Sequence, residues 1–115
     1  MPKSIYIYDY VCYYIMIKHI VMWKLKDFAE GMSKSENAKK MKDLLLSLKE
    51  KIDAINSMEV GINVNDNGEN WDIVLYSEFE NLDNLNIYMN HPEHKNVKEF
   101  ISKVRLKRVA VDYEV

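Results

Sequence analysis

Cysteine, glycine and proline are all scarce in this sequence of 115 residues. The only cysteine is Cys12, so the chain cannot form an internal disulfide, and a zinc site built on cysteines is excluded. A domain without disulfides is typical of a reducing compartment, and we therefore expect a cytoplasmic location. Three glycines and two prolines exclude a collagen-like or proline-rich linker protein.

A surplus of positive charge is also missing, because 16 basic and 18 acidic side chains give a net charge of -2. Nucleic-acid-binding proteins normally have a basic surplus on one face, so we expect no nucleic-acid partner. The sequence has no long hydrophobic run either. Asp9 and the N-terminal tyrosines interrupt the apolar core that a signal peptide would need. Asp9, Lys18 and His19 lie inside the only candidate window for a spanning helix, so we expect no membrane association.

The length fits a single domain with one core, and 48% apolar residues are typical of a globular one. Residues 1–15 stand out because they contain five of the eight tyrosines. Their tyrosines and β-branched residues favour a strand. However, lysine far outnumbers arginine, which suggests that the coding DNA is AT-rich. AT-rich DNA that is not normally translated would also read as Ile, Tyr and Lys, and Ile and Tyr are frequent before Met16. We predict that residues 1–15 are an extension outside the native domain, which spans 16–115 and begins near Met16. The N-terminus found by mass spectrometry of the natively expressed protein would test this.

Residues 16–26 have the period of two that is typical of a strand. Further on, Ser33 and Glu36 have the spacing of a capping box, which predicts the start of a helix. An amphipathic helix lying on a sheet is the interpretation that we favour, and a short surface coiled coil is the alternative. The apolar residues that follow Glu36 form one helical stripe at spacings of three and four: Ala38, Met41, Leu45, Leu48, Ile52 and Ile55.

Two more strands, 58–64 and 71–79, flank the turn-forming residues 65–68 and predict a β-hairpin. Asn81 can cap a short helix, and Pro92 fits the first position of the next one. That second helix has an apolar stripe of its own, formed by Val97, Phe100, Ile101 and Val104. Alternation over residues 109–115 predicts a last strand.

The predicted order is strand, helix, strand, strand, helix in two pieces, strand. This order is the split βαβ pattern of the ferredoxin-like α+β fold, with a four-stranded, mostly antiparallel sheet and helices on one face. Apolar side chains are also expected on the other face, at Ile20, Met22, Val74 and Tyr76. Because an exposed apolar sheet face requires a cover, we expect a homodimer formed through the sheet faces.

Several segments together resemble the stress-responsive dimeric α/β-barrel (Dabb) domain family, over roughly residues 16–113. A His-Pro-x-His segment with an upstream tyrosine, in Tyr88–His94, and Lys18-His19 on the first strand are the most specific of them. The resemblance implies a homodimeric α/β barrel, a pocket between sheet and helices for a small, mostly apolar organic molecule, and a stress-related role. The other similar segments are 16–17 and 20–21, 59–61, 72–75, 77–79 and 111–113.

Within this family, the chain is distantly similar to the plant polyketide cyclase that makes olivetolic acid by an aldol cyclisation without a cofactor. That similarity implies catalytic roles for His19, Tyr88 and His94. The sequence departs from the cyclase at Asp72, which stands in place of another histidine. Related dimeric barrels also include small monooxygenases and haem-degrading enzymes, so the fold alone does not decide the chemistry.

The residues themselves leave two interpretations open. The first turn of a helix lowers the pKa of His94, so a neutral imidazole could act as a general base. Tyr88 could then stabilise an enolate-like charge, and His19 could add a polar group to the pocket. The alternative is that all three side chains only pack the core. The residues therefore allow a binding protein, or a cyclase, lyase or isomerase that moves a proton next to a carbonyl. The resemblance to the related barrels adds a small monooxygenase as a third possibility.

The remaining candidates are structural. His91 is the expected N-cap beside Pro92, and Trp23 is expected in the core or pocket lining. His91 and His94 are three residues apart, and a zinc site would need a third ligand such as His19 or Glu93. We predict neither a metal nor a cofactor, since the sequence has no glycine-rich phosphate loop and no Ser/His/Asp arrangement.

Overall fold

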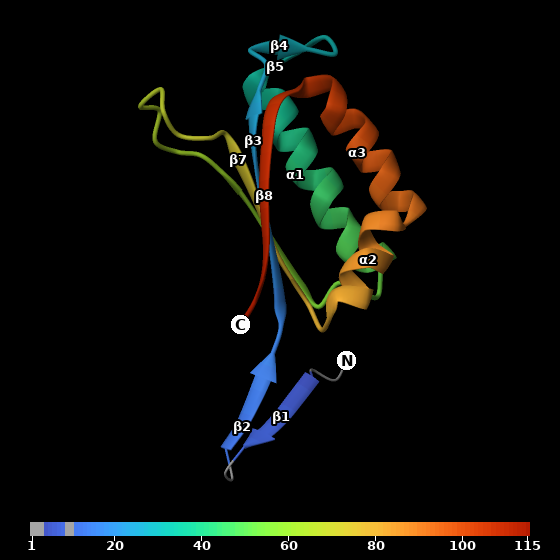
Figure 1. Cartoon of the computed structure of the whole chain (residues 1–115). Coiled ribbons are helices and arrows are strands. Elements are labelled where there is room, and N and C mark those ends of the chain that lie inside the picture. Colours follow the sequence, from blue (N-terminus) through green and yellow to red (C-terminus); the bar gives the residue numbers. More distant parts are fainter. Residues whose placement is uncertain (1–3, 9–10) are drawn as a thin grey trace.

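Four antiparallel strands form the largest sheet, in the order β6-β7-β3-β8, and three helices pack on one of its faces (Figure 1). The structure is a computed structural model that describes residues 4–8 and 11–115, with side chains from Ile15 onward. The sheet strands are β3 (Ile17–Leu25), β6 (Ser57–Ile62), β7 (Ile73–Phe79) and β8 (Arg105–Glu114). The helices are α1 (Lys34–Lys51), α2 (Leu82–Asn90) and α3 (Pro92–Val104).

Two small hairpins accompany this sheet. The first is β1 (Ser4–Tyr8) with β2 (Val11–Ile15), and the second is β4 (Phe28–Ala29) with β5 (Met32–Ser33). Figure 1 shows β1 and β2 standing apart from the helices, beyond the N-terminal end of β3. The strand preference expected for residues 1–15 is thus found in the described part of that segment. The β4–β5 hairpin was not predicted, and its turn has positive φ angles at Glu30 and Gly31.

The predicted caps are confirmed. The Ser33 side chain accepts a hydrogen bond from the Glu36 N–H, and the Glu36 side chain accepts one from the Ser33 N–H, so the capping box is complete. The Asn81 side chain accepts a hydrogen bond from the Asn84 N–H at the start of α2. Pro92 is the first residue of α3, where a missing N–H leaves no hydrogen bond unmade.

The predicted ends of several elements were wrong. Helix α1 stops at Lys51, and Ile52 and Ile55 follow it in non-helical backbone. Both side chains are nevertheless 2% exposed, because the chain turns under the helix and extends its apolar stripe into the loop. Strand β8 begins four residues earlier than expected, directly where α3 ends.

The hairpin of β6 and β7 is shorter than predicted. Val64 lies beyond β6 and is 99% exposed, and Trp71 lies before β7. Asparagine side chains between the strands bond to nearby backbone groups and to one another, and these bonds compete with the ladder. The period of two over 71–79 predicts that Trp71 shares a face with Ile73, and this was wrong. The Trp71 ring lies 5.6 Å from the Nζ of Lys24, whose side chain is on the opposite side of the sheet.

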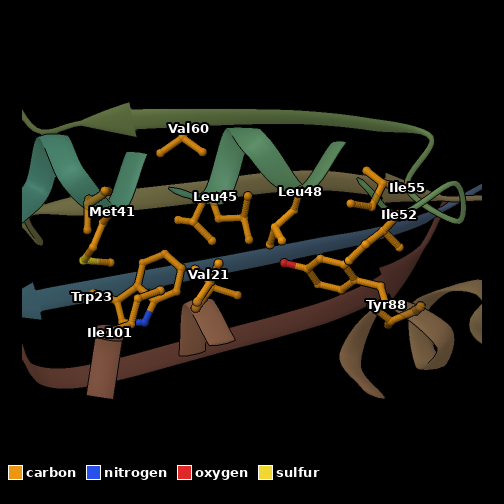
Figure 2. Close-up of a cluster of buried hydrophobic side chains, with 14 of the residues drawn as sticks. Val21, Trp23, Met41, Leu45, Leu48, Ile52, Ile55, Val60, Tyr88 and Ile101 are labelled. Carbon is orange, nitrogen blue, oxygen red and sulfur yellow. The ribbon is translucent and has the colours of Figure 1, made fainter. Parts of the chain in front are cut away.

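The core lies between the sheet and the helices. Strand β3 is buried at every second residue, and α1 and α3 cover this face with Leu45, Leu48 and Ile101 (Figure 2). The other face of the sheet is open in the single chain. We call it the open face, and its apolar side chains are Ile20, Met22, Val74, Tyr76, Val109, Val111 and Tyr113. None of the described helices is long and apolar enough to cross a membrane.

Candidate active site

Strand β3 directs His19 toward the helices. In the ladder, His19 lies opposite Ser77 of β7 on one side and Asp112 of β8 on the other. Its side chain is buried, with the residue 2% exposed, and the Ser77 hydroxyl donates to the His19 carbonyl at 3.1 Å. The position of His19 in the core is therefore fixed by the register of both neighbouring strands.

Asp112 determines which nitrogen of His19 faces the interior. The His19 Nδ1–H donates to the Asp112 Oδ1, and the Asp112 side chain remains 44% exposed. A carboxylate on one ring nitrogen fixes the tautomer, so that Nε2 is left as the acceptor. This pairing is typical of histidines that act as acids or bases and of histidines that are simply held in place.

The junction between α2 and α3 places an aromatic side chain and an imidazole side by side. Tyr88 in the last turn of α2 is fully buried, and its ring centroid is 4.5 Å from that of His94 in the first turn of α3. The ring of His19 lies 6.1 Å from that of Tyr88, and Phe79 lies 5.2 Å from Tyr88. The Tyr88 ring therefore has an edge contact with both histidine rings. Its hydroxyl points into the core (Figure 2).

Electrostatics keep His94 neutral and Tyr88 protonated. Burial, followed by the positive charge of Lys98, lowers the pKa of His94 from 6.5 to about 4. The direction is the one expected at a helix N-terminus, but desolvation is its main cause. Burial also raises the pKa of the Tyr88 hydroxyl, which the charge of Arg108 only partly offsets.

A cavity of about 250 Å³ connects these groups. His19, Tyr88, His94 and Trp23 all contribute to its wall, and most of the rest is aliphatic. The mouth lies between α3 and β8, where the exposed lining residues are Lys98, Ser102 and Arg108. The other lining residues of the cavity are Val21, Leu45, Leu75, Met89, Val97, Ile101 and Arg105.

The structure separates the other predicted residues from this cavity. His91 caps α3, where its Nδ1 accepts from the Glu93 N–H at 3.1 Å, and it does not line the cavity. Pro92 is likewise outside the lining. Over residues 4–8 and 11–115, no three metal-ligating side chains are grouped, so His91 and His94 do not form part of such a cluster. Asp72 lies elsewhere too, where it accepts from the Leu25 N–H at 2.8 Å.

Three charged residues of the cavity wall and one ion pair were not predicted from the sequence. Lys98, Arg105 and Arg108 line the cavity, and Asp112 holds His19. The spacing of Lys98 from His94 places both on one helix face, which was a usable signal. The positions of the arginines and of Asp112 depend on the register between β3 and β8, which the sequence does not specify.

Several solved structures have the same fold. A crystal structure from Bacteroides fragilis, described as a dimeric protein of unknown function with a ferredoxin-like fold, is 39% identical, with a TM-score of 0.75 over 87% of this chain and 96% of that one. A dimeric ferredoxin-like protein of unknown function from Thermobifida fusca is 20% identical, with a TM-score of 0.76 over 88% and 92%. A hydroxynitrile lyase from Passiflora edulis is 16% identical, with a TM-score of 0.70 over 87% and 93%.

These likenesses confirm the ferredoxin-like α+β fold that the order of elements predicted. A comparison with curated proteins gave no match. The model of one protein family, the stress responsive A/B barrel domain (Dabb), matches residues 17–115. The chain therefore belongs to the Dabb family, as the segments around His19 and Tyr88–His94 indicated.

Proposed function

We propose that the protein is a homodimer, joined through the open faces of its sheets, and that each protomer binds a small, mostly apolar organic molecule in the cavity of His19, Tyr88 and His94. The observation that carries the binding function is the cavity itself. A space of about 250 Å³ inside a small domain is far larger than the few water-sized voids of an ordinary core.

The open face supports the dimer. In the single chain, Met22, Val109, Val111 and Tyr113 are 37%, 41%, 52% and 42% exposed, on neighbouring strands. Contiguous apolar patches of this kind mark interaction sites, and a two-fold axis lets one patch cover another. The related structures from Bacteroides fragilis and Thermobifida fusca are described as dimeric, which is consistent with this assembly.

The binding function can be tested with the two tryptophans. Trp23 lines the cavity, whereas Trp71 lies outside it, so their indole N–H signals in an NMR spectrum form a probe and an internal control. We expect octan-2-one, a neutral apolar carbonyl compound, to shift the Trp23 signal in a saturable way and to leave the Trp71 signal unchanged.

A variant that fills the cavity provides the matched control. Val97 lines the cavity, and Val97→Phe adds volume there, so it should abolish the saturable shift. Phe100 is half-buried on the same helix, and Phe100→Leu leaves the cavity lining untouched, so it should keep the shift. Equal shifts of both tryptophans, or a shift that survives Val97→Phe, would contradict binding in this cavity.

A second candidate function is proton transfer next to a carbonyl. His94 is neutral because its pKa is lowered to about 4, and its Nδ1 is buried without a hydrogen-bond partner among the described residues. In this mechanism the His94 imidazole takes a proton from the carbon beside the carbonyl, and the Tyr88 O–H stabilises the resulting enolate. His19, held by Asp112, supplies a further polar group. A hydroxynitrile lyase has the same fold, so this fold accommodates lyase chemistry.

Deuterium exchange separates the two functions. An enzyme of this kind should catalyse exchange of the hydrogens next to the carbonyl of octan-2-one in D₂O. His94→Ala and Tyr88→Phe should each reduce that rate at least about a hundredfold. His91→Asn, outside the cavity, should leave it unchanged. Exchange at the rate of buffer alone, with the Trp23 shift intact, would reject catalysis of this reaction and keep binding.

A further inference from the structure

Both arginines of this lysine-rich chain line the same cavity. The sequence has 16 basic residues, of which only Arg105 and Arg108 are arginines, and both contribute to the wall together with Lys98. Over the described ranges, 4–8 and 11–115, no aspartate or glutamate lines the cavity and no carboxylate is ion-paired with either arginine. The mouth of the cavity therefore has positive charge that the neighbouring side chains do not neutralise.

A β-bulge brings the two arginines to the same side of the sheet. Trp23 pairs with Arg108 and Leu25 pairs with Arg105, and the register shifts between these pairs. Side chains of a regular strand alternate, so residues three apart would face opposite sides. The extra residue in the bulge restores both arginines to the covered side, and bulges are a common means of redirecting a side chain.

Buried polar atoms around the same cavity also lack partners. Trp23 Nε1 and His94 Nδ1 are buried and have no hydrogen-bond partner among the described residues. Trp23 as a whole is only 4% exposed. An indole N–H can only donate, so it requires an acceptor atom. Trp23 and Ile101 both line the cavity, and Figure 2 shows them on the same side of the core.

We infer that the ligand of this cavity is an organic anion, with a carboxylate or a phosphate ester bound by Arg105 and Arg108 and an apolar body among the aliphatic side chains. Guanidinium groups suit these anions because their planar array of N–H donors matches two oxygens at once. An oxygen of the ligand is also the acceptor that the Trp23 indole lacks. This inference rests on the proposed binding function and narrows its ligand class.

Three probes with the same eight-carbon body test the anionic group: octanoate, octyl phosphate and octan-1-ol. We expect both anions to shift the Trp23 indole signal with dissociation constants at least about tenfold lower than that of the alcohol. The double variant Arg105→Ala/Arg108→Ala should weaken binding of the anions at least about tenfold and leave the alcohol unaffected. The anion with the lower dissociation constant shows whether the ligand of the cavity is a carboxylic acid or a phosphate monoester.

Lys95→Ala is the matched control, because Lys95 is an exposed cation on α3 that does not line the cavity. It should change anion binding by less than about twofold. Equal affinity for the alcohol and the anions, or unchanged anion affinity in the double arginine variant, overturns the inference and leaves the proposed cavity function standing. If none of the probes, nor octan-2-one, shifts the Trp23 signal, the inference and the proposed function both fail.

Discussion

Both faces of the four-stranded sheet are rich in apolar side chains, but the helices cover only one of them (Figure 1). On the covered face Val21 and Leu75 are each 1% exposed, whereas on the open face Met22 and Val111 are 37% and 52% exposed. A strand that faces water on one side normally alternates apolar and polar residues. This chain therefore folds with two apolar surfaces, of which its own helices cover only one.

The largest effect is expected on the open face. Val111→Glu places a carboxylate in the middle of this face, and in the proposed dimer both copies would bury one, so we expect the dissociation constant to rise about a thousandfold. Sedimentation should show the wild type at twice 13.7 kDa and the variant as a monomer. Leu82→Asp, an exposed position on α2, should remain dimeric. A wild-type protein that is monomeric at micromolar concentration would contradict the dimer.

The covered face should respond through stability. Leu48 of α1 is fully buried against the sheet, and Leu48→Ala removes its contacts and leaves a cavity, so we expect a loss of about 2–5 kcal/mol in the free energy of unfolding. Leu46 lies on the same helix and is 37% exposed, and Leu46→Ala should cost less than about 1 kcal/mol. Urea unfolding at one fixed protein concentration measures both. Similar losses for the two variants would mean that α1 does not pack as described.

Protonation of His94 should have a smaller effect, on the same covered side. The folded protein titrates His94 at a pKa of about 4 and the unfolded chain at about 6.5, so between these pH values the unfolded chain binds the additional proton. The contribution of His94 to the free energy of unfolding therefore decreases as the pH falls from 6.5 to 4, and it is constant above pH 6.5. His94→Gln should remove this part of the pH dependence, and His91→Asn should retain it. Parallel pH profiles for the wild type and His94→Gln would contradict the lowered pKa.

Both apolar faces of the sheet could be predicted from the sequence, because they follow from local patterns. Strands repeat every 2 residues and helices every 3.6, and both periods can be read from a short stretch of sequence. The main strands, the helices and the apolar side chains of the open face could therefore be predicted. The predicted ends of elements were wrong where side chains form hydrogen bonds that redirect the backbone, as the asparagines do around Asn63–Asn70. The β4–β5 hairpin was not predicted, because a strand of two residues is too short to show a period.

Prediction of the candidate site depended on another kind of information. The positions of His19, Tyr88 and His94 followed from their segments and from the family resemblance. Their grouping around one cavity, by contrast, depends on how α2 and α3 turn at His91 and Pro92. Arg105 and Arg108 could not be assigned to it, because a shift of one residue in strand pairing changes the face of every side chain beyond it. Register between distant strands is set by packing, which a single sequence does not display.

The smallest predicted effect is at the edge of the covered face, where the helices no longer shield the sheet. Asp112 faces the covered side, but its carboxylate is 44% exposed, so its pairing with His19 should contribute only about 1 kcal/mol or less to stability. Its main effect should be on the tautomer: in Asp112→Asn the population of His19 with the proton on Nδ1 should fall. ¹⁵N chemical shifts of the imidazole at alkaline pH report this population directly. Glu114→Gln changes a neighbouring carboxylate on the same side of β8 and should leave the tautomer unchanged. An unaltered tautomer in Asp112→Asn would show that the core around Tyr88, and not the exposed carboxylate, orients the imidazole.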